Sequence, residues 1–547
     1  MNYSENNYEH EELAGTQRII TYDPNIETAT LLGEKTSIRL IPDPTNSPND
    51  PLNWSKWRKY WHSTLVLFVT GFTAAIANDA GSAGDAIDKD LSISYNVQNT
   101  AAGVLFLTIG LWTLIASPMP HLWGRRIQYL ICLLCGVGGS IWFALIRTKA
   151  DTISSQIFVG ASEACSEALV QLSLSDLFFQ HQRGGVLGVY ILATSIGTFL
   201  GPLVAGYIAA NNWQWVGWWG AIISGGTLVV FYFGLEETAF DREAFNGTQI
   251  PNNPAQVQLE YAEKKEPKDR VRDQSPSTSL PNEVVDPPKT YWQRIALITP
   301  SPDMVGTGLV QYGQRLLHTM RVFTFPAVIY SGLQWGAQDA WLSFYLTVEE
   351  DNWYDPPWNY SDAAVSIMNV PTLIGAIIGC IYGGWFSDVF VRWMAKRPGR
   401  NGISEAEDRL WLLLPSALLN PAGLILFGIG SGEGWLWPRP YVGLGLIGFG
   451  WGCAGDLSMA YLMDAYPDMV LEGMVGVAVV NNLMACVFTF VASIWISASG
   501  LSNTFIAIGV LSFFFQILTI PMMYWGKACR RWTAGQYKRY LYLRDGR

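Results

Sequence analysis

Five acidic residues stand deep inside long apolar stretches of the chain. They are Asp79, Glu163, Glu167, Asp339 and Asp456. A charge at the centre of a bilayer-spanning helix costs about 2.5–3.5 kcal/mol, so such residues face a cavity or a partner. We find no Lys or Arg at comparable depth in the sequence. Carboxylates without fixed basic partners require a mobile cation, which can be a proton or an amine.

The spacing of these acids supports a binding role. Glu163, Glu167 and Gln171 are four residues apart, so they share one face of a helix. Aromatic rings attract ammonium groups by about 0.5–2 kcal/mol. We therefore expect the five acids to bind substrate, with Glu163, Glu167 and Asp339 as candidates for proton coupling. The aromatic candidates for the same site are Trp341, Tyr345 and Tyr461.

Each of these positions also has a structural interpretation. Asp79 lies near the outer end of its apolar stretch and could reach water there, or capture substrate from outside. Asp456 could hydrogen-bond to a neighbouring helix. A single aromatic residue in an apolar helix more often packs than binds a ligand.

The elements that carry the acids are predicted membrane spans. Of the 547 residues, 50% are hydrophobic and 15% are charged, whereas a soluble domain carries about 25% charged residues. A helix needs about 20 apolar residues to cross a bilayer. Twelve stretches qualify: 60–82, 98–119, 127–147, 153–178, 185–209, 215–235, 325–348, 362–387, 408–429, 440–464, 472–498 and 503–526. The sequence thus predicts an all-α membrane protein of two six-helix bundles, with the acids in spans 1, 4, 7 and 10.

The loops set the predicted orientation and domains. Lys and Arg concentrate in the loops of one side, which predicts that both termini are cytoplasmic. The predicted segments are a cytosolic 1–59, bundles at 60–235 and 325–526, a linker at 236–324 and a tail at 527–547. The polar stretch 243–290 predicts disorder, and 308–321 predicts an amphipathic surface helix. The sequon at Asn359 is predicted to face outward, where it could be glycosylated.

Several functional classes are disfavoured. The net charge of −10 argues against a nucleic-acid partner. The sequence has no G-x-S-x-G, H-E-x-x-H or P-loop motif, so we do not expect an enzyme. The five His residues are scattered and the seven Cys residues lie mostly in apolar stretches. We expect no metal, cofactor or disulfide, and a monomer in the bilayer.

A glycine-rich run carries the first family resemblance. Gly197, Gly201, Pro202 and Gly206 stand in the fifth span, where small residues permit close packing and the proline bends the helix. The run resembles the antiporter motif of the major facilitator superfamily, in its twelve-span drug:proton antiporter branch. Gln156 stands where many members of that branch carry an arginine, which puts their usual proton relay in doubt here.

Two loops resemble the cytoplasmic gate motifs of the same superfamily. The loop after span 2 keeps Gly124, Arg125 and Arg126, with His121 where the motif has an acid. The loop after span 8 keeps the acid as Asp388, together with Arg392. The resemblance implies that these residues latch the cytoplasmic side, and more securely in the second half.

Further segments resemble fungal plasma-membrane transporters of polyamines, which also admit histidinol and other cations. Examples are Asn78-Asp79-Ala80-Gly81 and Ala460-Tyr461-Leu462-Met463-Asp464. This resemblance implies uptake of spermidine, spermine or putrescine, driven by protons, across the plasma membrane rather than the vacuolar membrane. A multidrug or amine exporter of the same fold, and an amine receptor that does not transport, stay open as alternatives.

Overall fold

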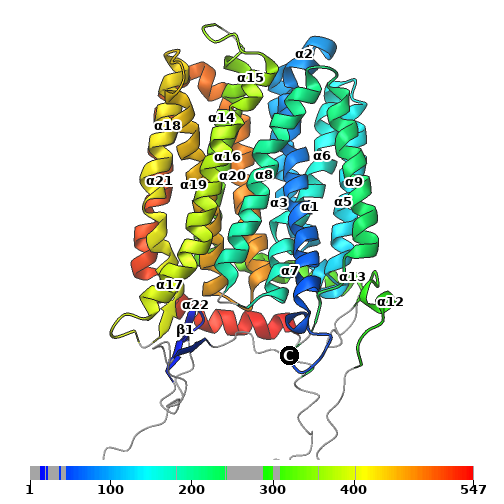
Figure 1. The fold of residues 1–547 in the computed structure, drawn as a ribbon, viewed down its shortest axis with the longest axis vertical. Helices are drawn as coiled ribbons and strands as arrows, with labels where there is room; N and C mark the ends of the chain where they lie inside the picture. The colour runs from blue at the N-terminus through cyan, green and yellow to red at the C-terminus, as the bar shows by residue number, and fades with distance from the viewer. Residues whose placement is uncertain are drawn as a thin grey trace, which may run out of the picture.

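The long helices run side by side in one bundle that has two halves (Figure 1). The computed structural model describes residues 13–18, 20–22, 36–38, 45–179, 182–240, 242, 245, 287–299, 308–354, 356–400 and 402–545. The predicted disordered stretch 243–290 lies almost entirely outside these residues. The first half is coloured blue to green in Figure 1, and the second half is coloured yellow-green to red.

The first half is built from apolar helices that match the predicted spans. They are α1 (Lys56–Ser82), α3 (Tyr95–Ala116) with α4 (Met119–Leu122), α5 (Arg125–Ala144), α6 (Lys149–Glu167) with α7 (Leu169–Leu177), α8 (Arg183–Ala209) and α9 (Gln214–Gly234). The short α2 (Gly84–Leu91) follows α1. The fourth span breaks at Ala168, whose φ of −139° leaves the helical region directly after Glu167.

The second half repeats this arrangement. Its helices are α14 (Pro326–Asn352), α15 (Asp362–Ile367), α16 (Asn369–Ile381), the π-helical η4 (Tyr382–Phe386), α17 (Ser387–Ala395), η5 (Ala406–Leu413), α18 (Ser416–Gly432), α19 (Arg439–Ala465), α20 (Val470–Ser499), α21 (Leu501–Ile517) and α22 (Thr519–Asp545). Across the two halves, α8 packs against α16 and α19, and α3 packs against α20.

Ten helical segments in the described residues are long and apolar enough to cross a membrane. The helices α14 and α19 are each 27 residues long and run within the same bundle (Figure 1). Both carry deep polar residues, such as Asp339 and Asp456, which lower their hydropathy. The arrangement is therefore consistent with the twelve predicted spans.

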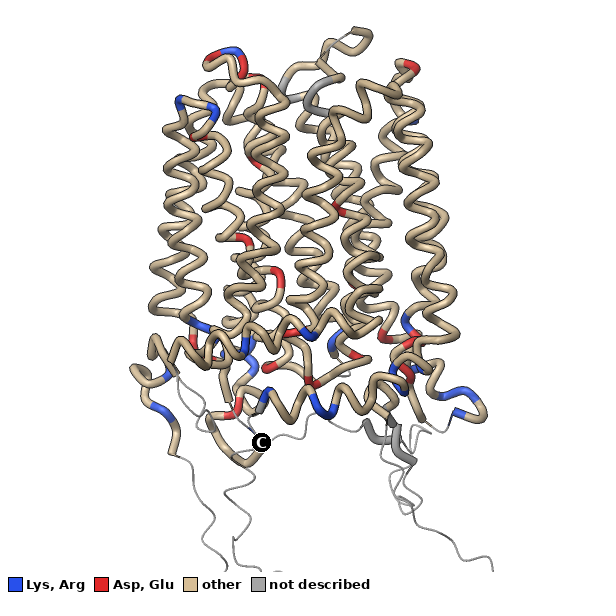
Figure 2. The backbone as a smooth tube through the Cα atoms, turned by 180° about the vertical axis from the view of Figure 1, so that it is seen from behind, with Lys and Arg blue, Asp and Glu red and all other residues tan. Residues whose placement is uncertain are grey.

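Charged residues are distributed unevenly along the bundle. Figure 2 shows Lys and Arg gathered at the end where the chain terminates, while the middle of the bundle carries isolated acidic residues. This pattern agrees with the predicted orientation, in which the basic end faces the cytoplasm. We use the terms basic end and outer end for the two ends of the bundle.

Short elements close the basic end. Strand β1 (Thr16–Arg18) pairs with β4 (Ile403–Glu405), and β2 (Ile20–Tyr22) pairs with β3 (Thr36–Ile38). The helix α22 turns across this end of the bundle (Figure 1). Its Arg530 donates to Glu405 at 2.9 Å and also bonds Glu407, and Thr16 donates to Glu405 at 2.6 Å. These contacts fasten residues far apart in the sequence to the second half.

The linker contributes one helix to the same end. The predicted amphipathic stretch forms α13 (Leu309–Thr319). Tyr312 of α13 stacks on Trp123, with ring centroids 5.5 Å apart, and His318 Nε2 donates to Tyr540 O of α22 at 3.0 Å. The outward face of α13 exposes Leu309 and Leu317.

Candidate functional site

Three of the predicted acids meet between the two halves. Glu163 and Glu167 lie one turn apart on α6, and Asp339 lies in the middle of α14. All three side chains are half-buried. Glu163 is within electrostatic range of both other acids, and Glu167 is within range of Asp339. Two carboxylates of the first half therefore lie within electrostatic range of one carboxylate of the second half, and we call these three residues the acid cluster.

The break in the fourth span positions part of this cluster. Glu167 is the last residue of α6, and the chain resumes as α7 after Ala168. Tyr190 of α8 donates to Ser166 O at 3.0 Å, so the broken turn is held from a neighbouring helix. Interrupted helices that line a central cavity are a recurring feature of transporter binding sites.

The close partners of the acid cluster are neutral. Trp451 Nε1 of α19 donates to Asp339 Oδ1 at 2.9 Å. The amide of Asn482 on α20 faces Glu167, and that of Asn481 lies close to Asp339. Within the described part of the chain, no Lys or Arg acts on any of the three carboxylates. The cluster thus has hydrogen-bond donors but no fixed positive charge.

Trp451 was absent from the predicted site residues. Its ring lies 4.7 Å from that of Trp335 and 5.6 Å from that of Phe199, measured between centroids, so aromatic rings of both halves meet beside Asp339. An indole in an apolar helix needs a partner for its N–H group. The sequence therefore indicates that Trp451 needs a hydrogen-bond acceptor, but it does not say which residue supplies one.

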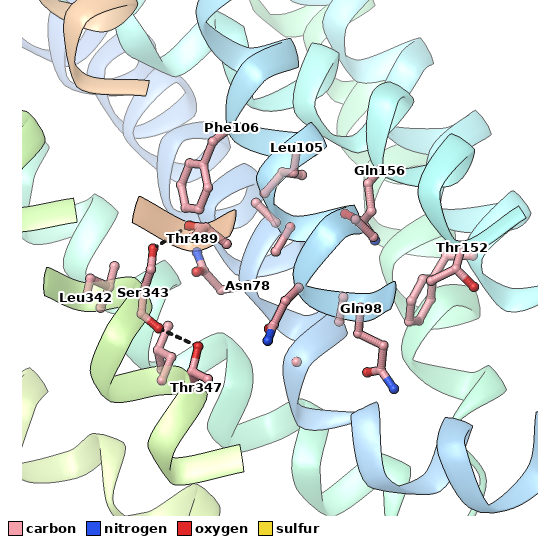
Figure 3. A pocket seen from close by; sticks show the side chains of 18 of the residues that line it. Asn78, Gln98, Leu105, Phe106, Thr152, Gln156, Leu342, Ser343, Thr347 and Thr489 are labelled. Carbon is pink, nitrogen blue, oxygen red and sulfur yellow. Dashed lines mark hydrogen bonds between the residues drawn. The ribbon is translucent and has the colours of Figure 1, made fainter. Parts of the chain in front are cut away.

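Figure 3 shows a pocket between the two halves. It lies on the outer side of the acid cluster, because its lining residues on α14 follow Asp339 toward the outer end. It has a cavity volume of about 90 Å³ and lies between α1, α3 and α6 of the first half and α14 and α20 of the second half. Its polar lining residues are neutral and include Asn78, Gln98, Gln156, Thr347 and Thr489. Ser343 also lines it, and its hydroxyl donates to Asp339 O at 3.2 Å, one turn away on α14. The inner end of the pocket therefore lies next to the cluster.

The two halves are joined at the basic end. Asp388 Oδ2 accepts from Gly185 N at the start of α8 at 2.7 Å, and Arg183 donates to Met463 O at 3.2 Å. His121 Nε2 of α4 lies 3.5 Å from Glu472 Oε1 of α20. Each contact crosses from one half to the other. The described conformation is thus closed at the basic end, with its pocket on the outer side.

The residues of the two predicted gate motifs lie at the basic end, and their role as a latch stays a prediction. Gly124 has a φ of +99° before α5, where Glu237 accepts from the N–H groups of Arg125 and Arg126 at 3.0 Å each. In the second half, Asp388 pairs with Arg409 at 3.0 Å. Arg392 instead donates to the backbone oxygen of Asp388 at 3.1 Å.

The remaining predicted acids lie away from the cluster. Asp456 is fully buried against glycines of both halves: a Cβ on Gly188 or Gly383 would lie 3.0 Å from its side chain. Its nearest charged groups are Arg409 and Asp388, which belong to the contacts that join the chain at the basic end; we call these contacts the seam. Asp79 is 7% exposed and lies where α1 meets α8, beside Gly201. The structure does not bring either residue to the acid cluster.

The three predicted aromatic residues lie inside the second half. Trp341 packs on Phe488 and Tyr345 on Phe427, while Tyr461 packs edge-on against Tyr330. Each of the three is fully buried. Their placement favours a packing role. Trp451, rather than any of these three residues, lies beside Asp339.

The glycine-rich run of α8 forms a close contact with α1. A Cβ on Gly197 would collide with Gly71 O, and one on Gly201 would lie 2.7 Å from Ala75 Cα. Pro202 lies within the helix. Asn359 of the predicted sequon is exposed near the outer end, and its glycosylation stays a prediction.

Comparisons with known proteins agree with this architecture. The family model of the Major Facilitator Superfamily matches residues 63–488. An MFS-type transporter of Schizosaccharomyces pombe is 52% identical over 98% of this chain and 95% of its own length. Protein HOL1 of Saccharomyces cerevisiae is 49% identical over 94% of each chain.

More distant proteins share the same fold. The MFS antiporter QDR3 of Candida albicans is 23% identical over 82% of this chain and 76% of its own length. Among solved structures, the MFS proton:xylose symporter XylE superposes with a TM-score of 0.55 at 11% identity, covering 86% of this chain and 96% of that chain. The chain belongs to the major facilitator superfamily, and it is a multi-pass membrane transporter rather than an enzyme.

Proposed function

We propose that this transporter carries organic cations across the membrane by alternating access, with polyamines as the favoured substrates. The observation that supports the proposal most strongly is the acid cluster. Three carboxylates from both halves face one another, and within the described residues their partners are neutral. Carboxylates in such a site repel one another until a proton or a bound ammonium group compensates them.

The shape of the site favours a substrate with more than one charge. Glu163 and Glu167 are presented by α6 and Asp339 by α14, so separate ammonium groups of one flexible chain could each find a carboxylate. The rings of Trp335 and Trp451 beside Asp339 add about 0.5–2 kcal/mol for each cation that they contact. The sequence resemblance to fungal polyamine transporters supports the same class.

Contacts that span the two halves support alternating access. The bonds of Asp388 and Arg183 must break before the basic end can open, while the cluster lies between the halves throughout. The membrane potential contributes about 2.3 kcal/mol per charge per 100 mV, so it favours uptake of a polycation. We further propose proton coupling through the cluster, a plasma-membrane location and a monomeric protein.

Uptake of labelled spermidine tests the proposal. Cells that lack their own polyamine uptake would be given this chain and assayed at external pH 5 and pH 7. The expected result is accumulation above that of cells without the chain, reduced by unlabelled spermine and putrescine, and dependent on external pH. Accumulation equal to that of control cells at both pH values contradicts the proposal.

Export is the second candidate, because a specific observation favours it. The close α1–α8 contact through Gly197 and Gly201 is built from the run that resembles the antiporter motif, and the related QDR3 is named an antiporter. The same assay separates the two directions. Spermidine levels below those of control cells would establish export.

A receptor that binds amines without carrying them is the alternative from another class. Deleting residues 245–288, within the predicted linker, separates it from a transporter. Uptake that survives the deletion shows that the linker is not needed for transport. Amine binding by the purified protein, without transport in cells or in proteoliposomes, would support the receptor.

A further inference from the structure

A long groove lies between α1 and α8 on the outside of the bundle. It has a volume of about 500 Å³ and extends along α1 from Thr64 to Asp79, which is about 22 Å of helix. Its rim consists of apolar side chains that are 39–51% exposed in the protein alone. The rim residues are Phe68, Ile196, Leu200, Val204 and Trp219. In a membrane-embedded chain, this rim faces the hydrocarbon core of the bilayer.

The floor of the groove is backbone. Gly71 of α1 and Gly197 of α8 touch, because a Cβ on Gly197 would collide with Gly71 O. Gly201 approaches Ala75 in the same way. The small residues that bring the two helices together thus leave the space above them free of side chains. A narrow apolar channel of this length suits one extended hydrocarbon chain.

A single charged group lines the groove, and it is Asp79. The side chain is 7% exposed, and its buried Oδ1 has no hydrogen-bond partner. A Cβ on Gly201 would lie 2.8 Å from this oxygen, which places the carboxylate at the α1–α8 contact. The residues lining the groove include no Lys, Arg or His. Behind the groove, Asp79 also borders a small pocket lined by Ser140 and Gln156, which are neutral. A buried carboxylate without a positively charged partner needs either a proton or a cation.

We propose that this groove binds a long-chain alkylamine from the bilayer, with its ammonium group at Asp79 and its chain along α1 and α8. Asp79 lies less than one turn before α1 ends at Ser82, so the ammonium group lies toward the outer membrane interface. The hydrocarbon chain of the amine then points toward the membrane interior, as a lipid chain does. The site is distinct from the acid cluster, which lies between the halves and holds none of the groove residues.

Photolabelling of the full-length protein in lipid nanodiscs tests this site. The probe is hexadecylamine with a diazirine on its chain, and labelled peptides are identified by mass spectrometry. We expect labels in residues 64–79 and 193–204, reduced about tenfold or more by Asp79→Asn, since that change removes the charge partner. Hexadecanol with the same diazirine should label these residues much less.

Two further variants keep the test decisive if Asp79→Asn folds poorly. Leu200→Trp fills the groove from its rim and should remove the label. Leu134→Trp makes the same change on α5, at a side chain that is 62% exposed and lies outside the groove, and it should leave the labelling unchanged. Equal labelling by the amine and the alcohol, or full labelling of Leu200→Trp, would overturn the proposal.

Discussion

Acidic residues occur at two levels of this protein, and their partners differ. At the basic end, Asp388 and Asp464 share Arg409 at 3.0 and 2.7 Å, and Glu405 shares Arg530 with Glu407. In the middle of the bundle, the acid cluster meets indole and amide groups instead. Acids of the first kind hold the structure together. In the proposed function, acids of the second kind bind the mobile cation.

The comparison also separates Asp456 from the cluster. Asp456 is as deep as Asp339 by sequence, yet it is enclosed by glycines of α8 and η4 and faces the region of Arg409. Depth in an apolar span therefore does not by itself define a binding residue. The partners across the interface decide whether a buried acid belongs to the site or to the seam.

The largest expected effect is the loss of transport when the cluster loses a charge. Glu167→Gln or Asp339→Asn should reduce polyamine uptake about tenfold or more, because a lost charge-assisted contact costs about 1.5–3 kcal/mol. Uptake is measured in cells with surface expression checked in parallel. Glu433→Gln, at an exposed acid near the outer end, serves as the matched control. Normal uptake in both cluster variants would falsify the assignment.

The second-largest effect is expected when the ion pairs of Arg409 at the basic end are broken. Arg409→Gln leaves Asp388 and Asp464 without their shared partner, and breaking a buried pair costs about 3–5 kcal/mol. We expect a lower melting temperature of the purified protein, together with uptake reduced about fivefold. Arg392→Gln should change both by much less, because Arg392 bonds to a backbone oxygen. Equal effects of the two changes would contradict the seam described for the basic end.

A smaller effect is expected for the neutral donor of the cluster. Trp451→Phe keeps an aromatic ring but removes the N–H group that bonds Asp339. A single hydrogen bond to a charged group contributes about 1.5–3 kcal/mol, part of which water can replace in a half-exposed site. We expect the KM for spermidine to rise about threefold with little change in maximal rate. An unchanged KM would remove Trp451 from the site.

The smallest effect is a pH dependence of stability at the basic end. Burial by itself raises the pKa of Glu405, but hydrogen bonds from Lys527, Thr16 and Arg530 hold that pKa below the ordinary value of 4.5. The stabilisation is therefore complete above pH 4.5 and is lost as the pH falls through the lower, folded-state pKa. The melting temperature of the wild type should fall more steeply than that of Glu405→Gln below about pH 4.5. Parallel curves would show that Glu405 contributes nothing to this dependence.

The sequence predicted the helices well because membrane crossing imposes a minimum apolar length. The predicted stretch 60–82 lies within Lys56–Ser82, and 472–498 lies within Val470–Ser499. The shared position of Glu163 and Glu167 could also be predicted, because their spacing puts them on one helix face. The break at Ala168 and the pairing of β1 with β4 could not be predicted, because both depend on packing between distant segments.

The partners of the acids were the least predictable part of the site. Asp388 and Arg392 are four residues apart, which suggests an ion pair. In the structure, the carboxylate of Asp388 instead pairs with Arg409, which belongs to the next span. Trp451 reaches Asp339 from another helix, 112 positions along the chain. In the sequence, Asp79 lies in an apolar stretch, as the other deep acids do. Only the packing of α1 on α8 shows that it lies at a different place from them. Sequence spacing identifies neighbours on one helix but not those across an interface.

Equilibrium binding of labelled spermidine to the purified protein tests the central claim most directly. The variant combining Glu163→Gln, Glu167→Gln and Asp339→Asn would be compared with the wild type and with Asp388→Asn at the basic end. We expect saturable binding by the wild type and by Asp388→Asn, and none by the triple variant. Wild-type affinity in the triple variant would contradict a cation site at the acid cluster.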